Sequence, residues 1–303
     1  MGGTLAGVVI GVGLPLVAYE KVDGVETLIG SRVTLAAGIF SVLAVICYLL
    51  CYNLVTERVR IEAPQGKQES VVQMMKSAIH NRSLISIIAA SIVMLLAQLT
   101  IQNMSGYVYP DYYNNASAQS VSNLVMMVDM LLAAALVKPL AKRFGKCEVS
   151  VVSSIAAVVI NLVLFVVRPA NVWVYVGFQF LCWLALGMFS MVSWALITDV
   201  NDDSECRTGR REDGTVYALY SFARKLGQAA SAGLSGLLLE LIGYSAATRT
   251  DPTVQEGLFN ISVLVPALEF ALLALILWFW YPLHKKQVNE NVLTLKKKRA
   301  AGQ

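Results

Sequence analysis

Residues Asp202–Gly214 read Asp-Asp-Ser-Glu-Cys-Arg-Thr-Gly-Arg-Arg-Glu-Asp-Gly, and eight of these thirteen side chains carry a charge. The stretches on either side, roughly 172–199 and 215–243, are long and apolar enough to cross a membrane as helices. A run this polar cannot lie in hydrocarbon, so it predicts a tight aqueous turn between two membrane spans. The rest of the chain can be divided in the same way, into apolar spans and polar turns.

The composition is that of an integral membrane protein. Of the 303 residues, 56% are hydrophobic and 15% are charged, and the mean hydropathy is +0.61. A soluble domain would carry roughly a quarter charged residues. We therefore expect an all-α multi-pass membrane protein that sits in a lipid bilayer. The net charge of +4 does not indicate a nucleic-acid partner, because the basic residues are spread among the loops and the tail.

Apolar stretches of about 20 residues predict eight transmembrane helices. They lie at roughly 2–18, 33–55, 84–108, 119–140, 148–167, 172–199, 215–243 and 260–282. An even number of spans puts both termini on one side of the membrane. If that side is the cytoplasm, 18 of the 24 basic residues fall in the inner loops and tail. This asymmetry predicts a protein of the cytoplasmic (inner) membrane with both termini in the cytoplasm.

The longest predicted connection, 56–83, divides the chain unequally. Its apolar residues Val71, Met74, Met75, Ala78 and Ile79 fall at helical spacing, which predicts an amphipathic helix on the inner membrane surface. The predicted units are the last two helices of an N-terminal half (1–55), a cytoplasmic linker (56–83), a six-helix C-terminal half (84–282) and a basic cytoplasmic tail (283–303).

Charges inside the spans are candidates for a solute or ion pathway, because charge at that depth is costly to keep. Arg224 and Lys225 lie inside the seventh span, and Asp129 lies near the middle of the fourth. Adjacent residues diverge by about 100° on a helix, so we expect Lys225 to face a cavity and Arg224 to reach toward the inner acids. An ion pair of Asp129 with Lys225 or Arg224 would serve either a pathway or the structure alone. Glu269 is a weaker candidate.

Several polar and small side chains fall at helical spacing. Gln98 and Gln102 share a helix face with Asn103 beside them, and such amides hydrogen-bond either sugar hydroxyls or neighbouring helices. Gly227, Ser231 and Ser235 form a row that favours close helix packing. The five cysteines and two histidines show no disulfide or metal spacing, so we expect neither a metal site nor a bound cofactor.

One group of motifs resembles the signature of the glycoside–pentoside–hexuronide:cation symporter family. The matching positions are Asp199-x-x-Asp202, Glu205-x-x-Thr208-Gly209-x-Arg211-x-x-Gly214, Tyr217-x-x-Tyr220-Ser221-Phe222-Ala223-Arg224-Lys225-Leu226-Gly227-Gln228-Ala229 and Gly243-Tyr244. Members commonly carry a Tyr-Gly pair where this chain has Asp203-Ser204, and a tryptophan where it has Cys206. These departures leave the main motif intact and are expected to alter gating at the inner loop.

The resemblance implies a partial major facilitator fold with eight transmembrane helices. The family has twelve helices in two halves, and this chain is similar to helices five to twelve. Helices one to four carry the family's paired cation-binding acids and most of its sugar contacts. The resemblance thus implies a truncated gene product, a mis-assigned start or part of a split protein, completed by the missing helices or by a complementary chain. We expect the chain to transport nothing by itself.

The function implied is secondary active symport of a sugar or glycoside with Na⁺ or H⁺, with binding near the midplane between the halves. Lys225 matches the family's helix-eleven lysine near the cation site, and Trp194 would either stack on a sugar ring or pack. The expected pathway residues are Lys225, Asp129, Gln98, Gln102, Asn103 and Trp194. The expected inner-gate residues are Asp199, Asp202, Arg207, Arg210, Arg211, Lys142 and Arg143.

Three alternatives stay open. The turn from Pro139 to Lys146, bracketed by proline and glycine, is either an anchor on anionic headgroups or a gating turn between rocking helices. The chain could be a non-transporting remnant. A multi-span membrane enzyme would need an acid or histidine constellation at the membrane surface. The cluster at 199–213 is the one candidate for it and is balanced by its own arginines, so we do not expect an enzyme.

Overall fold

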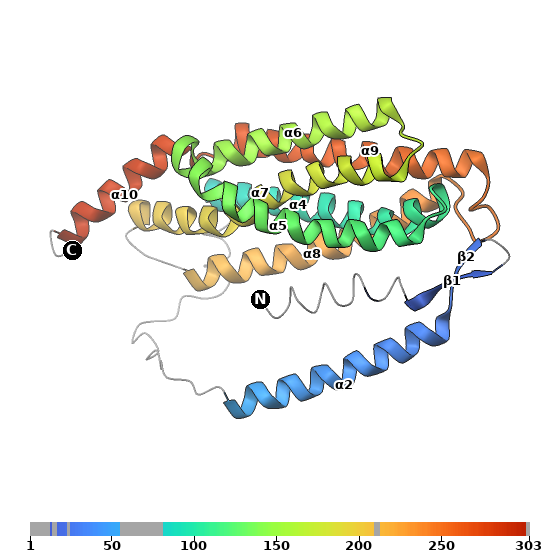
Figure 1. Ribbon diagram of the computed structural model, residues 1–303. Helices are drawn as coiled ribbons and strands as arrows, with labels where there is room; N and C mark the ends of the chain where they lie inside the picture. The colour runs from blue at the N-terminus through green and yellow to red at the C-terminus, as the bar shows by residue number, and fades with distance from the viewer. Residues whose placement is uncertain (1–12, 14–16, 23–24, 55–80, 209–212, 301–303) are drawn as a thin grey trace.

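A computed structural model describes residues 13, 17–22, 25–54, 81–208 and 213–300 of the chain. Its elements are β1 (Tyr19–Val22), β2 (Val25–Leu28), α2 (Gly30–Leu54), α4 (Arg82–Tyr107), η1 (Val108–Tyr112), α5 (Ala116–Phe144), α6 (Lys146–Val167), α7 (Val172–Thr208), α8 (Asp213–Leu241), α9 (Pro252–Leu275), η2 (Ile276–Trp280) and α10 (Lys285–Ala300). Helices α4 to α9 lie side by side as a bundle, and α2 runs apart from it (Figure 1).

Seven of the eight predicted spans are helical. In the described part of the chain, six helices have the length and apolar character of a membrane span, namely Gly30–Leu54, Arg82–Tyr112, Ala116–Phe144, Lys146–Val167, Val172–Arg207 and Pro252–Trp280. The seventh, α8, is long enough, but its charged and small polar residues lower its hydropathy. Nearly all of the predicted span at 2–18, and the predicted linker helix with Val71, Met74, Met75, Ala78 and Ile79, lie outside the described residues.

The helix starts follow from local capping chemistry. The side chains of Asn81, Asn115 and Asp251 accept hydrogen bonds from the first backbone N–H groups of α4, α5 and α9. These bonds satisfy donors that have no partner inside a helix. Pro252 occupies the first turn of α9, where its missing N–H costs nothing. The capping residues therefore determine where these three helices begin.

The turn between α5 and α6 is tighter than we expected. Pro139 does not bracket it, because α5 continues through this proline to Phe144. The chain reverses at Gly145, whose φ of 114° is in the region that side chains avoid. A Cβ atom there would also collide with the Glu148 carboxylate. One glycine therefore sets the angle between the two helices.

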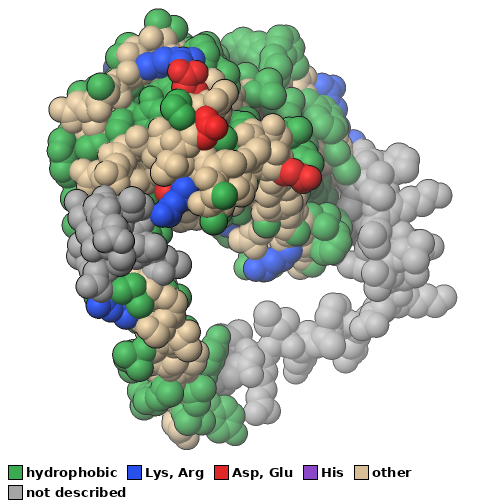
Figure 2. Space-filling model, turned by 90° about the vertical axis from the view of Figure 1, so that its right-hand side faces the viewer, with side chains coloured by type: hydrophobic (Ala, Val, Ile, Leu, Met, Phe, Trp, Pro, Cys, Tyr) green, Lys and Arg blue, Asp and Glu red, His purple; other side chains and the backbone are tan. Residues whose placement is uncertain are grey.

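The bundle packs as helix pairs. α4 lies against α8 and α9, α6 against α7 and α9, and α5 against α7. Seen from the hairpin end, hydrophobic side chains lie around the sides of the bundle and charged ones lie over its end (Figure 2). Buried side chains such as Met94, Phe189 and Phe270 fill its core. Apolar side chains around its sides are what a helix bundle in lipid requires.

The connection between the predicted spans at 2–18 and 33–55 contains two β-strands. β1 and β2 form an antiparallel hairpin in which Tyr19 faces Leu28. α2 follows it, and none of its side chains is buried within the described residues. A helix that is apolar all round belongs in lipid or against other protein. The predicted basic tail is also ordered, as helix α10.

Gly227 tests the close contact of α8 with α4. A Cβ on Gly227 would lie 3.4 Å from the Cβ of Leu95, while Gly233 on the same helix has open space around it. We expect Gly227→Val to push α4 and α8 apart and to destabilise the protein by about 1–3 kcal/mol. Thermal unfolding in detergent measures this, with Gly233→Val as the control. Equal losses in both variants would contradict this packing.

Candidate functional site

Aromatic rings join α7 to the first turns of α8. Trp194 of α7 stacks on Tyr217 of α8, with ring centroids 5.7 Å apart and planes inclined by 27°. It also meets the Tyr220 ring edge-on at 5.3 Å. Arg224 holds its guanidinium 5.9 Å from the centre of the Tyr220 ring. We call these four residues the Trp194 cluster. Because Trp194 is 46% exposed, part of its ring stays accessible to a ligand.

Lys225 lies on the open side of α8. Its neighbours in sequence Ala223 and Gly227 are buried, and Gly227 faces Leu95 of α4. Lys225 is two residues from each, about 200° around the helix, and therefore points away from α4. Its ammonium donates to Gln228 Oε1 at 3.1 Å and is exposed. A charge so far inside a membrane helix requires water or a protein partner on that side.

Two of the three predicted amides, on α4, face away from α9. Thr100 donates to Glu269 Oε1 at 3.1 Å, which identifies the side of α4 that faces α9. Gln98 and Gln102 are two residues from Thr100, so they point to the opposite side, and Gln102 is exposed. Asn103 instead donates to Ser235 Oγ of α8 at 3.0 Å and joins two helices. Gln98 and Gln102 are thus the amides available to a ligand.

Asp129 is not paired with a base as the sequence analysis suggested. It is only 2% exposed, and neither carboxylate oxygen has a hydrogen-bond partner among the described residues. The reason is the packing order, since α5 lies against α7 while α8 lies against α4. Lys225 bonds Gln228 instead, and Arg224 lies over Tyr220. An unpaired carboxylate at this depth favours a bound proton or cation.

The predicted inner-gate residues are only partly brought together. Asp199 of α7 is held by Lys146 of α6, with Nζ 2.5 Å from Oδ1. The predicted Lys142 and Arg143 are exposed at the end of α5 instead, and Asp202 is half-buried. Arg210 and Arg211 lie outside the described residues. The base next to the turn, Lys146, is therefore the partner that sequence reasoning missed.

Asp203, also missed as a site residue, joins three helices at this end. Its carboxylate accepts from Ser83 Oγ of α4 at 3.1 Å and from Asn291 Nδ2 of α10 at 3.2 Å. Arg207, a predicted gate residue, lies 3.7 Å from it, one helical turn further along α7. The i,i+4 spacing of Asp203 and Arg207 was the one signal in the sequence.

Both departures from the family motif contact α10. Asp203 bonds Asn291, and Cys206 Sγ lies 3.5 Å from the carbonyl oxygen of the same residue. Lys298 Nζ donates to the carbonyl of Cys206 at 3.4 Å. The residues that set this chain apart from the motif therefore fasten its last helix to the end of α7.

The opposite end of the bundle is closed by the Gly-Tyr pair of the motif. Gly243 has a φ of 69°, a conformation that glycine adopts without strain. The next residue, Tyr244, donates to Asp111 Oδ2 at 2.5 Å, and Gln255 donates to the Asp111 carbonyl at 2.8 Å. Burial raises the pKa of the Tyr244 phenol, and the bond to Asp111 raises it further. The phenol thus stays protonated and keeps the loop in place.

The bundle of long, apolar helices defines a multi-pass membrane protein. A sequence model described as MFS/sugar transport protein matches residues 1–285, and the chain belongs to this family. The resemblance and the partial major facilitator fold are thereby confirmed. It is a family of transporters and not of enzymes, as expected.

Curated relatives agree with this assignment. The chain is 29% identical over 265 residues to the uncharacterized symporter YjmB of Bacillus subtilis, covering 86% of this chain and 57% of that protein. It is 27% identical over 266 residues to the glucuronide carrier protein homolog of Escherichia coli, covering 88% and 57%. It is 26% identical over 305 residues to the isoprimeverose transporter of Lactiplantibacillus pentosus, covering 96% and 62%. The chain thus spans little more than half the length of these relatives.

The contact of α10 can be tested with two asparagines of that helix. Asn291 is buried against Asp203, while Asn289 is exposed. We expect Asn291→Ala to leave Asp203 short of a donor and to raise the rate of proteolysis within α10 about fivefold to tenfold. Limited proteolysis followed by mass spectrometry measures this rate. Asn289→Ala should leave it unchanged, and a similar increase in both variants would refute the role of Asp203.

Proposed function

We propose that this chain forms the sugar- and cation-handling C-terminal part of a symporter that carries a sugar or glycoside with Na⁺ or H⁺. The observation that carries the proposal is the family match over residues 1–285, together with the names of the relatives, which include a symporter and sugar carriers. The full transporter would hold its substrate between two halves and rock between inward- and outward-facing states.

The chemistry of the side chains of Trp194, Gln98 and Gln102 supports a carbohydrate substrate. Sugar rings present C–H groups that pack on aromatic faces, and Trp194 leaves part of its ring exposed. Sugar hydroxyls need donors and acceptors, which the free amide of Gln102 and the half-buried Gln98 supply. A pocket that combines an apolar surface with a few polar groups is the usual design for small ligands.

Lys225 and Asp129 are the proposed coupling residues, with different roles. The Lys225 ammonium is itself positively charged and cannot bind a cation. It would instead compete with the coupling cation for carboxylates on helices that face α8. Such acids would come from the four helices that the family places before this part of the fold. Neither carboxylate oxygen of Asp129 has a hydrogen-bond partner within the part of the chain that the structure describes, and Asp129 would carry the proton or contact the cation directly.

The division of the chain and its orientation belong to the same proposal. Residues 1–55 would complete an N-terminal half, 56–83 would link the halves, 84–282 would form the C-terminal half, and 283–303 would be a cytoplasmic tail. The exposed Lys142 and Arg143 lie at the same end of the bundle as α10, which favours a cytoplasmic position for this end.

A second candidate is a remnant of such a transporter that does not transport. A remnant would keep the fold of the bundle without forming a substrate site. The two candidates can be distinguished by adding the first four helices of a relative as a separate chain. Transport is restored only if this chain still recognises the substrate.

Trp194 provides the first test. We expect vesicles that contain this chain together with the first four helices of the Bacillus subtilis relative to accumulate a labelled glycoside down a cation gradient. Trp194→Ala should lower this uptake about fivefold, because stacking of this kind is worth about 1 kcal/mol. Trp173→Ala, which removes an equally exposed tryptophan near the start of the same helix, is the control. Absence of uptake with every glycoside tried would favour the remnant.

Asp129→Asn separates coupling from sugar binding. The amide has the same shape but cannot exchange a proton or attract a cation. We expect the variant to keep sugar exchange without a gradient and to lose accumulation driven by the cation. Counterflow and gradient-driven uptake measure the two activities in the same vesicles. Accumulation at the level of the unmodified chain would show that Asp129 is only structural.

A further inference from the structure

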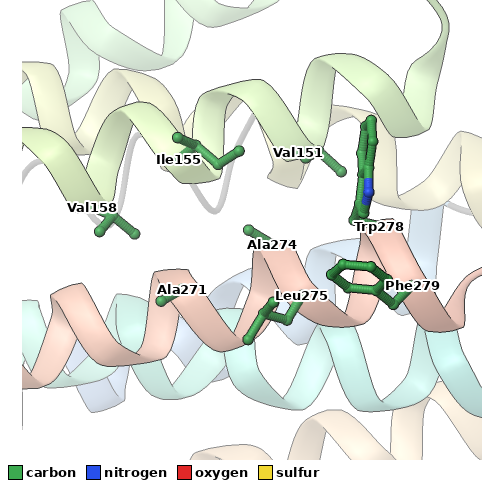
Figure 3. Close-up of a pocket in the computed structure, with 8 residues that line it drawn as sticks. All are labelled: Val151, Ile155, Val158, Ala271, Ala274, Leu275, Trp278 and Phe279. Atoms are coloured by element: carbon green, nitrogen blue, oxygen red, sulfur yellow. The ribbon is translucent and has the colours of Figure 1, made fainter.

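An apolar groove runs between α6 and α9 on the outside of the bundle (Figure 3). Its volume is about 480 Å³, within the range of pockets that hold small ligands. All its lining side chains are apolar, and they are Val151, Ile155, Val158, Ala271, Ala274, Leu275, Trp278 and Phe279. None of the candidate substrate residues on α4, α7 and α8 lines the groove. It would accept an alkyl chain but offers no partner to a sugar.

The groove lies at the depth of the hydrocarbon. Val151 is five residues from the start of α6, about 8 Å along its axis, and Val158 is about 18 Å from the start. The groove thus extends from near the helix end toward the middle of a hydrocarbon core about 30 Å thick. A ligand at this position must come from the bilayer itself, which restricts the occupant to lipid or to another membrane helix.

Trp278 indicates where the groove meets the membrane surface. It stands beside Val151 at one end of the groove (Figure 3), and its ring meets the His284 ring edge-on at 6.2 Å. Tryptophan is enriched at the level of lipid headgroups. This end of the groove is also the end nearest to α10, so a lipid chain in the groove would have its headgroup near the start of that helix.

Positive charge is concentrated at the same level. We call Lys142, Arg143, Lys285 and Lys286 the basic cluster. Lys285 Nζ donates to the Arg143 carbonyl at 2.6 Å, which holds the α5–α6 turn against the start of α10.

The acids beside the cluster are already engaged. Glu148 accepts from the backbone N–H of Lys285 at 3.0 Å and faces His284 at 3.7 Å, and Asp199 is bound by Lys146. The four bases outnumber Glu148 and Glu290, the acid one helical turn beyond Lys286, so net positive charge remains at this end of the bundle, where it attracts an anionic headgroup.

We propose that the groove between α6 and α9 holds one acyl chain of an anionic phospholipid whose phosphate lies against the basic cluster. The apolar walls account for the chain, and the four bases account for the charge of the headgroup. A zwitterionic lipid would fill the groove equally well but would gain less from the bases. The site therefore selects for headgroup charge, independently of any sugar bound on the other side of the bundle.

Lipid retention by the purified 303-residue protein tests whether the groove binds an acyl chain. Native mass spectrometry would compare phosphatidylglycerol with phosphatidylcholine of the same acyl chains. Ala271→Phe should fill the groove and weaken phosphatidylglycerol retention about tenfold, since each methylene excluded from contact costs a few-fold in affinity. Leu268→Phe, at an exposed site one turn away on α9, is the control. Ile155→Ala, which widens the groove without adding bulk, should also weaken retention and covers a folding failure of Ala271→Phe.

Headgroup selection needs a second pair of variants. Lys142→Gln combined with Lys286→Gln should reduce the preference for phosphatidylglycerol over phosphatidylcholine about fivefold or more. Lys296→Gln with Lys297→Gln, further along α10, should leave the preference unchanged. Equal retention of both lipids by the unmodified chain would overturn the proposal. So would unchanged retention in both groove variants, or a dimer that buries α6 and α9.

Discussion

The absence of water inside the bilayer is the constraint on which the rest of this structure depends. Polar groups within the bundle must find partners on other helices, because lipid offers none. Three such contacts join the helices in pairs, and each connects one side chain of α4 or α6 to a neighbouring helix. They are Thr100 with Glu269, Asn103 with Ser235, and Asn161 with Cys182. Together with the glycine contact of α8, they determine which face of each helix is turned inward.

Other polar and aromatic side chains of the bundle do not take part in these contacts between helices. Lys225, Gln102 and the exposed ring of Trp194 belong to helices α8, α4 and α7, and none of them is turned toward the pairings above. Facing lipid, they would be costly. Facing water or further protein, they would be available to a polar ligand, which is the role that we propose for them in this member of a sugar-transport family.

The two ends of the bundle are held differently. At the Asp203 end, several charged residues and the last helix form one network, while at the other end the contacts include Asp111, which accepts from both Tyr244 and Gln255. Hydropathy predicted where the spans lie, and the 100° step predicted that Arg224 and Lys225 diverge. Neither could predict that Lys146 holds Asp199, since Lys146 is 53 residues away in the sequence and other bases, such as Arg207, are much nearer.

The sequence by itself determined the apolar spans, the polar turns between them and the face on which each side chain lies, because these depend on local hydropathy and helical period. Only the tertiary structure decided which helices are neighbours. That order leaves Asp129 without the base we expected, commits Asn103 to Ser235, and turns Asp203 into the junction of three helices. A helical pattern specifies the direction of a side chain around its own axis, but its partner depends on long-range packing.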